Sequence, residues 1–166
     1  MRKIILSGII LLFIISCSVR YSFTGASISP DIKTFSVVEF ENVASTQIPG
    51  LSNRLSEQLK DKFLSETNLT MVRTNGDLIF EGKVSSYNVS IQSVQANEVA
   101  AMNRLTIGIQ IQFTNQKEPL KSFETSFSRY AEFSSDKNID DVEADLHKEI
   151  LDQLVDDIFM KSVADW

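Results

Sequence analysis

The segment 105–113 alternates between apolar and polar residues without a fault, and this pattern constrains the fold more than any other. Its apolar members are Leu105, Ile107, Ile109, Ile111 and Phe113. Successive side chains of a β-strand point to opposite faces, so the pattern predicts a strand with one face in a core and one in water. A loop at 115–119 and a second strand pattern at 120–133 predict an antiparallel hairpin.

A further strand pattern covers residues 78–91, and its two halves carry their apolar residues with opposite parity. Leu78, Phe80 and Val84 share one parity, whereas Tyr87, Val89 and Ile91 share the other. A β-bulge absorbs a switch of this kind, and we expect it at Ser85 and Ser86. Shorter strand patterns lie at 34–41 and around 69–72.

Two segments have the period of an amphipathic helix. The first follows Pro49 and Gly50, runs to about residue 65, and has the apolar row Leu51, Leu55, Leu59 and Phe63. The second runs from Asp140 to about residue 163, and has the apolar row Val142, Leu146, Ile150, Leu154 and Ile158. The order β-α-β-β-β-α predicts an α+β fold, with two helices packed on one face of a roughly four-stranded, mostly antiparallel sheet.

The N-terminus has the composition of a secretion signal. Arg2 and Lys3 precede an apolar run at 4–15, and Ser16 and Cys17 follow it. The run is shorter than the roughly 20 residues that cross a bilayer. Cys17 is the only cysteine, and its place after a small residue indicates a lipidation site that carries diacylglycerol and palmitate chains. The alternative is an ordinary cleaved signal with a free thiol nearby.

The predicted organisation is a signal peptide at 1–16, a lipidated lead-in segment at 17–33 and a single α+β domain at 34–166. Hydrophobic residues make up 43% of the sequence and charged residues 23%, which is typical of a folded chain. The acidic charge is concentrated, because residues 136–166 hold ten acidic and three basic residues. Nucleic-acid binding needs a basic surface, so we expect no nucleic-acid partner.

Signals for catalysis or for a bound cofactor are poor. His147 is the only histidine, and a solvated position at the edge of the helical apolar row is its default interpretation. The aspartates of the last helix lack the loop and central glycine of a calcium site, so we expect a solvated acidic face. No nucleophile elbow, P-loop or histidine-rich metal spacing occurs. We therefore expect no enzyme activity, no metal and no cofactor besides the lipid on Cys17.

The polar residues of the central strands are nearly free of charge, since only Glu98 and Arg104 are charged between Val84 and Gln116. This set comprises Ser85, Ser86, Asn88, Ser90, Thr106, Gly108, Gln110 and Gln112, with Thr125, Ser126 and Ser128 on the next strand. One interpretation is a plain hydrophilic sheet face. The other is a surface that hydrogen-bonds a protein or glycan without desolvating charge, with Thr106, Gln110 and Gln112 as partner contacts.

Three basic residues near the predicted hairpin are candidates for contact with a phosphate or a sugar acid. They are Arg104, Lys117 and Lys121. Solvated basic residues are the alternative, because single basic residues are common on protein surfaces. At the C-terminus, Trp166 either docks into a partner or closes the core, and both interpretations stay open.

The chain resembles the LptE-type lipopolysaccharide-assembly lipoproteins, most of all those of the Bacteroidetes branch. The resemblance rests on Cys17 and on the segments YSFTG at 21–25, ISPDIK at 28–33, AAMNRLT at 100–106 and KSVADW at 161–166. It covers essentially the whole mature chain in element order. It implies two helices on a four-stranded sheet and a role without catalysis.

The resemblance also implies a location and partners. Such proteins sit as a plug inside a large outer-membrane β-barrel of the LptD type and assist the insertion of lipopolysaccharide into the outer leaflet. They are lipid-anchored at the periplasmic face of the outer membrane. The family's basic lipopolysaccharide contacts do not map residue by residue, so Arg104, Lys117 and Lys121 remain candidates from their own chemistry.

Two other functions stay open. A stand-alone periplasmic lipoprotein that binds lipid or glycan requires an apolar pocket between sheet and helices. A small periplasmic hydrolase rests only on the abundance of carboxylates, and no pair of them is identifiable as an acid and a base.

Overall fold

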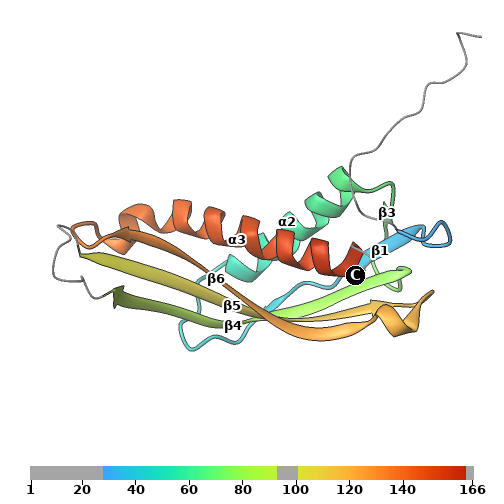
Figure 1. The fold of residues 1–166 in the computed structure, drawn as a ribbon, viewed down its shortest axis with the longest axis horizontal. Coiled ribbons are helices and arrows are strands. Elements are labelled where there is room, and N and C mark those ends of the chain that lie inside the picture. The colour runs from blue at the N-terminus through green and yellow to red at the C-terminus, as the bar shows by residue number, and fades with distance from the viewer. Residues whose placement is uncertain (1–27, 93–100, 164–166) are drawn as a thin grey trace, which may run out of the picture.

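A long twisted sheet carries both helices on one side in the computed structural model, which describes residues 28–92 and 101–163 (Figure 1). The strands are β1 (Thr34–Val37), β2 (Glu41–Asn42), β3 (Thr70–Met71), β4 (Leu78–Gln92), β5 (Met102–Asn115) and β6 (Phe123–Ser134). The helices are α2 (Leu51–Glu66) and α3 (Ile139–Val163), and the short 3-10 helix η1 (Pro119–Lys121) lies between β5 and β6.

The sheet is mixed, with the order β3-β1-β4-β5-β6 and with β2 beside β4. β1 is parallel to β3 and β4, and β2 is parallel to β4, whereas β4, β5 and β6 form an antiparallel meander. The α+β class and the packing of both helices on one face are confirmed. The predicted sheet of about four mostly antiparallel strands is wrong. β2 has only two residues, too few for an alternating pattern, and periodicity does not encode strand direction.

The bulge in β4 lies where the switch of parity predicts it. The pairing of β4 with β5 shifts register between Val84 and Ser86, so Val84 lies opposite Ile109 and Tyr87 opposite Ile107. The extra residue turns Tyr87 to the same side of the sheet as Val84. Both halves of β4 therefore present their apolar residues to the helices.

The core fills the space between the helices and the sheet. Phe35, Phe63, Phe80 and Phe113 are at most 1% exposed, and their rings form a chain with centroids 4.7 to 5.3 Å apart. Each such ring pair contributes about 0.5–1.5 kcal/mol beyond the area that it buries. The rings come from β1, α2, β4 and β5, so one aromatic row joins α2 to the sheet.

Candidate functional site

The face of the sheet turned away from α2 and α3 is uncovered by any described helix (Figure 1). We call this surface of β4, β5 and β6 the open face. Its members are Glu81, Lys83, Ser86, Asn88, Ser90, Arg104, Thr106, Gly108, Gln110, Gln112, Glu124, Ser126, Ser128, Tyr130 and Glu132. The structure thus brings the predicted partner contacts Thr106, Gln110 and Gln112 onto one surface.

The centre of the open face is neutral. Cross-strand register joins Ser86, Gly108 and Ser128 in one row. The next row joins Asn88, Thr106 and Tyr130. Gly108 is buried, and the Ser86 hydroxyl occupies the space that a Cβ at position 108 would need.

One residue of the predicted polar set lies on the other face. Thr125 is in register with Ile111, whose side chain is fully buried on the helix side. Polar residue type alone does not reveal which residues of a strand lie on which face of the sheet. The pairing of β6 with β5 decides it.

Charges border the neutral centre at both ends. Gln112 lies between Glu81 and Glu124 in register, and Gln110 Nε2 donates a hydrogen bond of 2.6 Å to Glu124 Oε1. A shallow depression of about 180 Å³ is lined by these residues together with Lys83, Glu41 and Gly82. Gln112 is therefore a boundary residue, whereas Thr106 lies at the neutral centre.

Arg104 lies at the other border, near the start of β5. Its guanidinium pairs with Glu132 at 2.5 Å and stacks on the Tyr130 ring, 4.0 Å from the centroid. The stacked ring and the bound carboxylate hold the guanidinium in a fixed position. An anionic ligand at Arg104 would have to replace the carboxylate of Glu132.

Lys117 and Lys121 lie at the η1 end of the sheet. Lys117 Nζ is 3.2 Å from Asp77 Oδ1, and Lys121 Nζ is 2.7 Å from Glu118 Oε2. The backbone N–H groups of Lys33 and Thr34 and the Lys117 ammonium lower the pKa of Asp77 to about 2. Each lysine thus has a carboxylate partner in the structure.

The structure does not bring the three basic candidates together. Arg104 and Lys117 are 13 residues apart along β5 and the turn after it, a separation of about 40 Å in extended chain. A ligand of the size of one phosphate therefore cannot contact both ends. Arg104 on one side, and Lys117 with Lys121 on the other, stay separate predictions.

A polar cluster around two buried side chains, Tyr87 and His147, joins α2, α3 and β4. We call it the His147 cluster, and its members are Arg54, Tyr87, Glu143 and His147. Arg54 Nη2 donates to His147 Nδ1 at 3.2 Å, His147 Nε2 lies 3.1 Å from Tyr87 Oη, and Tyr87 Oη donates to Glu143 Oε1 at 2.9 Å. A guanidinium only donates, so Nδ1 accepts and the ring proton lies on Nε2. His147 is therefore neutral and donates to Tyr87.

Burial sets the protonation of this cluster. His147 is 1% exposed and Tyr87 6%. Burial lowers the pKa of His147, and the Arg54 cation lowers it further against the opposing effect of Glu143. Burial and the Glu143 carboxylate raise the pKa of Tyr87. The chain of donors runs from Arg54 to Glu143 without an unpaired member.

The solvated position predicted for His147 is wrong. The bulge in β4 turns Tyr87 up beneath α3, and the partners of His147 lie 60 and 93 positions away in sequence. Helical periodicity gives no sign of either contact. The cluster links both helices to β4 and so positions them on the sheet.

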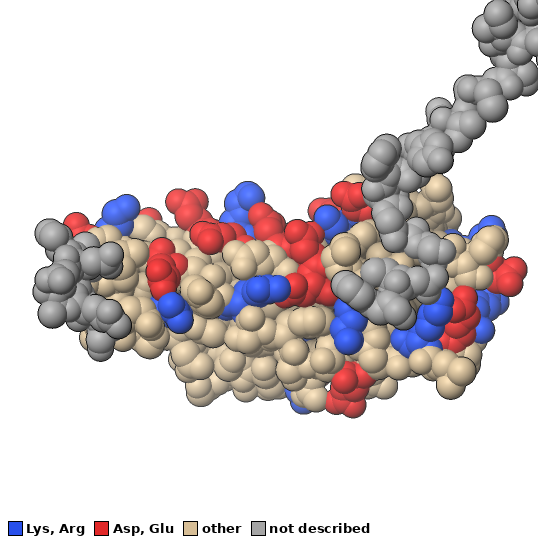
Figure 2. All heavy atoms as spheres, viewed as in Figure 1, with Lys and Arg blue, Asp and Glu red and all other residues tan. Residues whose placement is uncertain are grey.

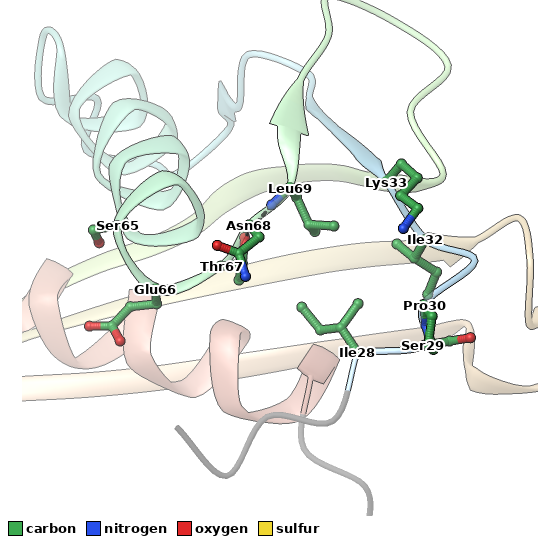
Figure 3. A pocket seen from close by; sticks show the side chains of 10 residues that line it. All are labelled: Ile28, Ser29, Pro30, Ile32, Lys33, Ser65, Glu66, Thr67, Asn68 and Leu69. Carbon is green, nitrogen blue, oxygen red and sulfur yellow. Dashed lines mark hydrogen bonds between the residues drawn. The ribbon is translucent and has the colours of Figure 1, made fainter. Parts of the chain in front are cut away.

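A cavity of about 660 Å³ lies beside the C-terminal end of α2 (Figure 3). The chain segment that enters β1 forms its other wall, and the lining includes Ser65, Thr67, Asn68, Lys33 and Ile28. Most of these side chains are polar. The cavity is thus not the apolar pocket between sheet and helices that a stand-alone lipid-binding protein requires.

Acidic side chains gather along α3 (Figure 2). Three of them pair with nearby bases: Asp157 with Arg129 at 2.5 Å, Asp152 with Lys148 at 2.9 Å and Asp156 with Lys62 at 2.9 Å. Within residues 28–92 and 101–163, no group of three or more His, Cys, Asp or Glu residues is arranged to hold a metal ion. Cys17 and Trp166 lie outside the described residues.

A model of the LptE family, described as lipopolysaccharide-assembly, matches residues 32–162. The chain belongs to this family. Proteins of the LptE family are non-catalytic lipoproteins of lipopolysaccharide assembly, so family membership confirms the expectation that this protein is not an enzyme. They are associated with the outer membrane and have no known cofactor. Among the described helices of this chain, none is both long and apolar enough to cross a membrane.

Two solved structures share the fold at low identity, and a third is similar at a lower TM-score. The hypothetical protein CT253 from Chlamydia trachomatis is 7% identical, with a TM-score of 0.55 and coverage of 81% of this chain and 99% of that one. Lipoprotein B from Nitrosomonas europaea is 13% identical, with a TM-score of 0.50 and coverage of 76% and 79%. A minor lipoprotein from Acinetobacter baumannii is 15% identical, with a TM-score of 0.49 and coverage of 76% and 89%. No curated protein matches the sequence.

Proposed function

We propose that this LptE-family protein binds and plugs an outer-membrane β-barrel translocon of the LptD type. In that complex it assists the transport of lipopolysaccharide to the outer leaflet. The observation that carries the proposal is the open face, a long sheet surface with a neutral polar centre that no described helix covers. Hydroxyl and amide groups find new hydrogen bonds in an interface at far lower desolvation cost than charges do. Such a face suits burial against another protein.

The length of the intervening chain limits how far the folded domain can lie from the proposed anchor. Lipid chains on Cys17 would hold the protein at the periplasmic face of the outer membrane. The 11 steps from Cys17 to Ile28 span at most about 40 Å of extended chain. The proposed α+β domain at 34–166 would therefore remain within reach of a barrel in the same membrane.

Lipopolysaccharide is the proposed second partner, with Arg104, Lys117 and Lys121 as contacts. Each is held by a carboxylate in the structure: Glu132, Asp77 and Glu118, respectively. A phosphate carries more charge than a carboxylate and accepts the same bidentate pattern from a guanidinium. If phosphates of the ligand replaced these carboxylates, each basic side chain would keep an anionic partner while the ligand binds.

The proposal is tested by recovering the protein with its partner from outer membranes. The full-length chain carries a C-terminal tag, and the membranes are solubilised in a mild detergent that keeps other barrel complexes intact. We expect a large β-barrel protein near one-to-one stoichiometry. Recovery of the lipoprotein alone would contradict the proposal and favour a stand-alone binding protein.

A matched pair of variants locates the interface. Thr106→Arg places a charge between Asn88 and Tyr130 at the neutral centre, and we expect it to reduce recovery of the barrel at least tenfold. Thr74→Arg adds the same charge at an exposed position in the connection between β3 and β4, where recovery should be unchanged. Equal recovery with both variants would remove the open face from the interface.

A further inference from the structure

The outer edge of β4 changes from paired to unpaired along its length. β1 pairs with residues 78–80 of this edge and β2 with residues 83 and 84, both in the parallel direction. Beyond the bulge, residues 86–92 have β5 as their only strand partner within the described chain. Figure 1 shows this half of β4 as the outer strand of the sheet. We call residues 86–92 of β4 the free edge.

Backbone geometry shows which groups of the free edge are exposed. The carbonyls of Phe80 and Val84, whose side chains face the helices, accept hydrogen bonds from Val38 and Val43 on the outer side. Residues of one strand that share a face also direct their N–H and C=O groups to the same side. Tyr87, Val89 and Ile91 face the helices, so each directs one donor and one acceptor away from β5.

The free edge carries neither charge nor proline. Natural edge strands carry charges or proline that prevent pairing with another chain. Residues 85–92 read SSYNVSIQ, with no charge and no proline. Val89 is 49% exposed and Ile91 81% exposed, so apolar surface accompanies the unpaired backbone groups.

The side chains around the free edge indicate what kind of molecule could bind there. On the helix side, the carboxylates of Glu143 and Asp140 act on the Tyr87 hydroxyl, so negative charge lies beside Tyr87, at the start of the free edge. On the other side, Ser86, Asn88 and Ser90 are polar and neutral. A second copy of this chain would bring its own acidic α3 next to these carboxylates, which places like charges together. A lipid has no peptide backbone that could pair with the free edge.

We propose that the free edge binds an extended segment of a different protein by β-strand addition. The segment alternates apolar residues, which pack beside Val89 and Ile91, with neutral polar residues, and carries a basic residue near Glu143. Its backbone pairs with the outward N–H and C=O groups of Tyr87, Val89 and Ile91. This edge is separate from the open face, and the inference does not depend on the proposed barrel partner.

Site-specific photo-crosslinking in cells tests the inference on the full-length lipidated protein. A photoreactive residue replaces Ile91 in one variant and Leu120, a fully exposed apolar residue of η1, in the control. We expect an adduct from position 91, and not from position 120, that maps to one segment of one partner with the stated alternation. An adduct with a second copy, an adduct with lipid, or no adduct would overturn the proposal.

Charge on the edge provides the second test. The double variant Val89→Lys/Ile91→Lys should reduce recovery of the crosslinked partner at least tenfold, whereas Leu120→Lys should not change it. Val89 is 49% and Ile91 81% exposed, so each lysine can place its ammonium in water, and circular dichroism checks that the fold is kept. In the recovered complex, the amides of Val89 and Ile91 should exchange hydrogen at least tenfold more slowly than in the isolated chain. Unchanged recovery or unchanged exchange would contradict strand addition.

Discussion

Replacing Tyr87 by Phe tests the energetic role of the His147 cluster. The ring keeps its place under α3, but the hydroxyl that links His147 Nε2 to Glu143 Oε1 is lost. The Nε2–H of His147, in a side chain that is only 1% exposed, then loses its hydrogen-bond acceptor, because Glu143 Oε1 lies 3.7 Å from Nε2, beyond hydrogen-bond distance. Glu143 keeps access to water, because a third of its side chain is exposed.

The expected loss of stability follows from the difference in exposure between His147 and Glu143. A buried donor left unsatisfied costs about 1–3 kcal/mol, whereas a carboxylate in contact with water recovers its hydrogen bond from solvent. We therefore expect the free energy of unfolding to fall by about 1–3 kcal/mol, nearly all of it from His147. Urea denaturation of the mature chain, followed by circular dichroism, measures this change.

Tyr130→Phe is the matched control. Tyr130 is 50% exposed, and its ring contact with Arg104 remains in the variant. A surface change of this kind should stay within about 0.5 kcal/mol of the wild type. Equal destabilisation by the two variants, or none by Tyr87→Phe, would refute the argument that the cluster stabilises the packing of α3 on β4.

Three further predictions concern pH, backbone packing and the anchor. The free energy of unfolding should fall between pH 7.5 and 5.5, because burial lowers the pKa of His147 from its ordinary 6.5 and the unfolded chain then binds a proton that the folded chain excludes. His147→Gln should flatten this dependence in urea denaturation, and an unaltered slope would assign the titration to other groups. Gly76→Ala should destabilise by about 1–3 kcal/mol or more, since a Cβ there would lie 2.6 Å from the backbone of Phe35 and Ser36. The same denaturation assay measures it against Thr74→Ala, and equal midpoints would contradict the close approach. Cys17→Ala should release the protein from the membrane fraction, whereas continued retention would argue against lipidation.

The strands and helices with strong periodicity were predictable because their signals are local. The alternation in 105–113 predicted the centre of β5, and the parity switch in 78–91 placed the bulge at Ser85 and Ser86. The apolar row from Leu51 to Phe63 is buried along α2. These patterns depend only on the two-residue repeat of a strand and the 3.6-residue repeat of a helix.

The candidate site was predictable in part. Neutral polar residues at alternate positions marked Thr106 and Gln110 as neighbours on one face, and the structure places them there. The same reasoning failed for Thr125, because its face depends on the register of β6 against β5. It also grouped Arg104 with Lys117, which an extended strand holds far apart.

The sequence by itself determined the signal-like N-terminus, the two amphipathic helices, the long meander strands and the neutral character of their polar residues. Only the tertiary structure decided the parallel pairing of β1, the burial of His147, the carboxylate partners of Arg104 and Lys117, and the length of β4 left without an outer neighbour. All of these depend on contacts between residues far apart in the chain, such as Tyr87 and His147, 60 positions apart. Local periodicity states which side of an element is apolar, but it does not state which element that side meets.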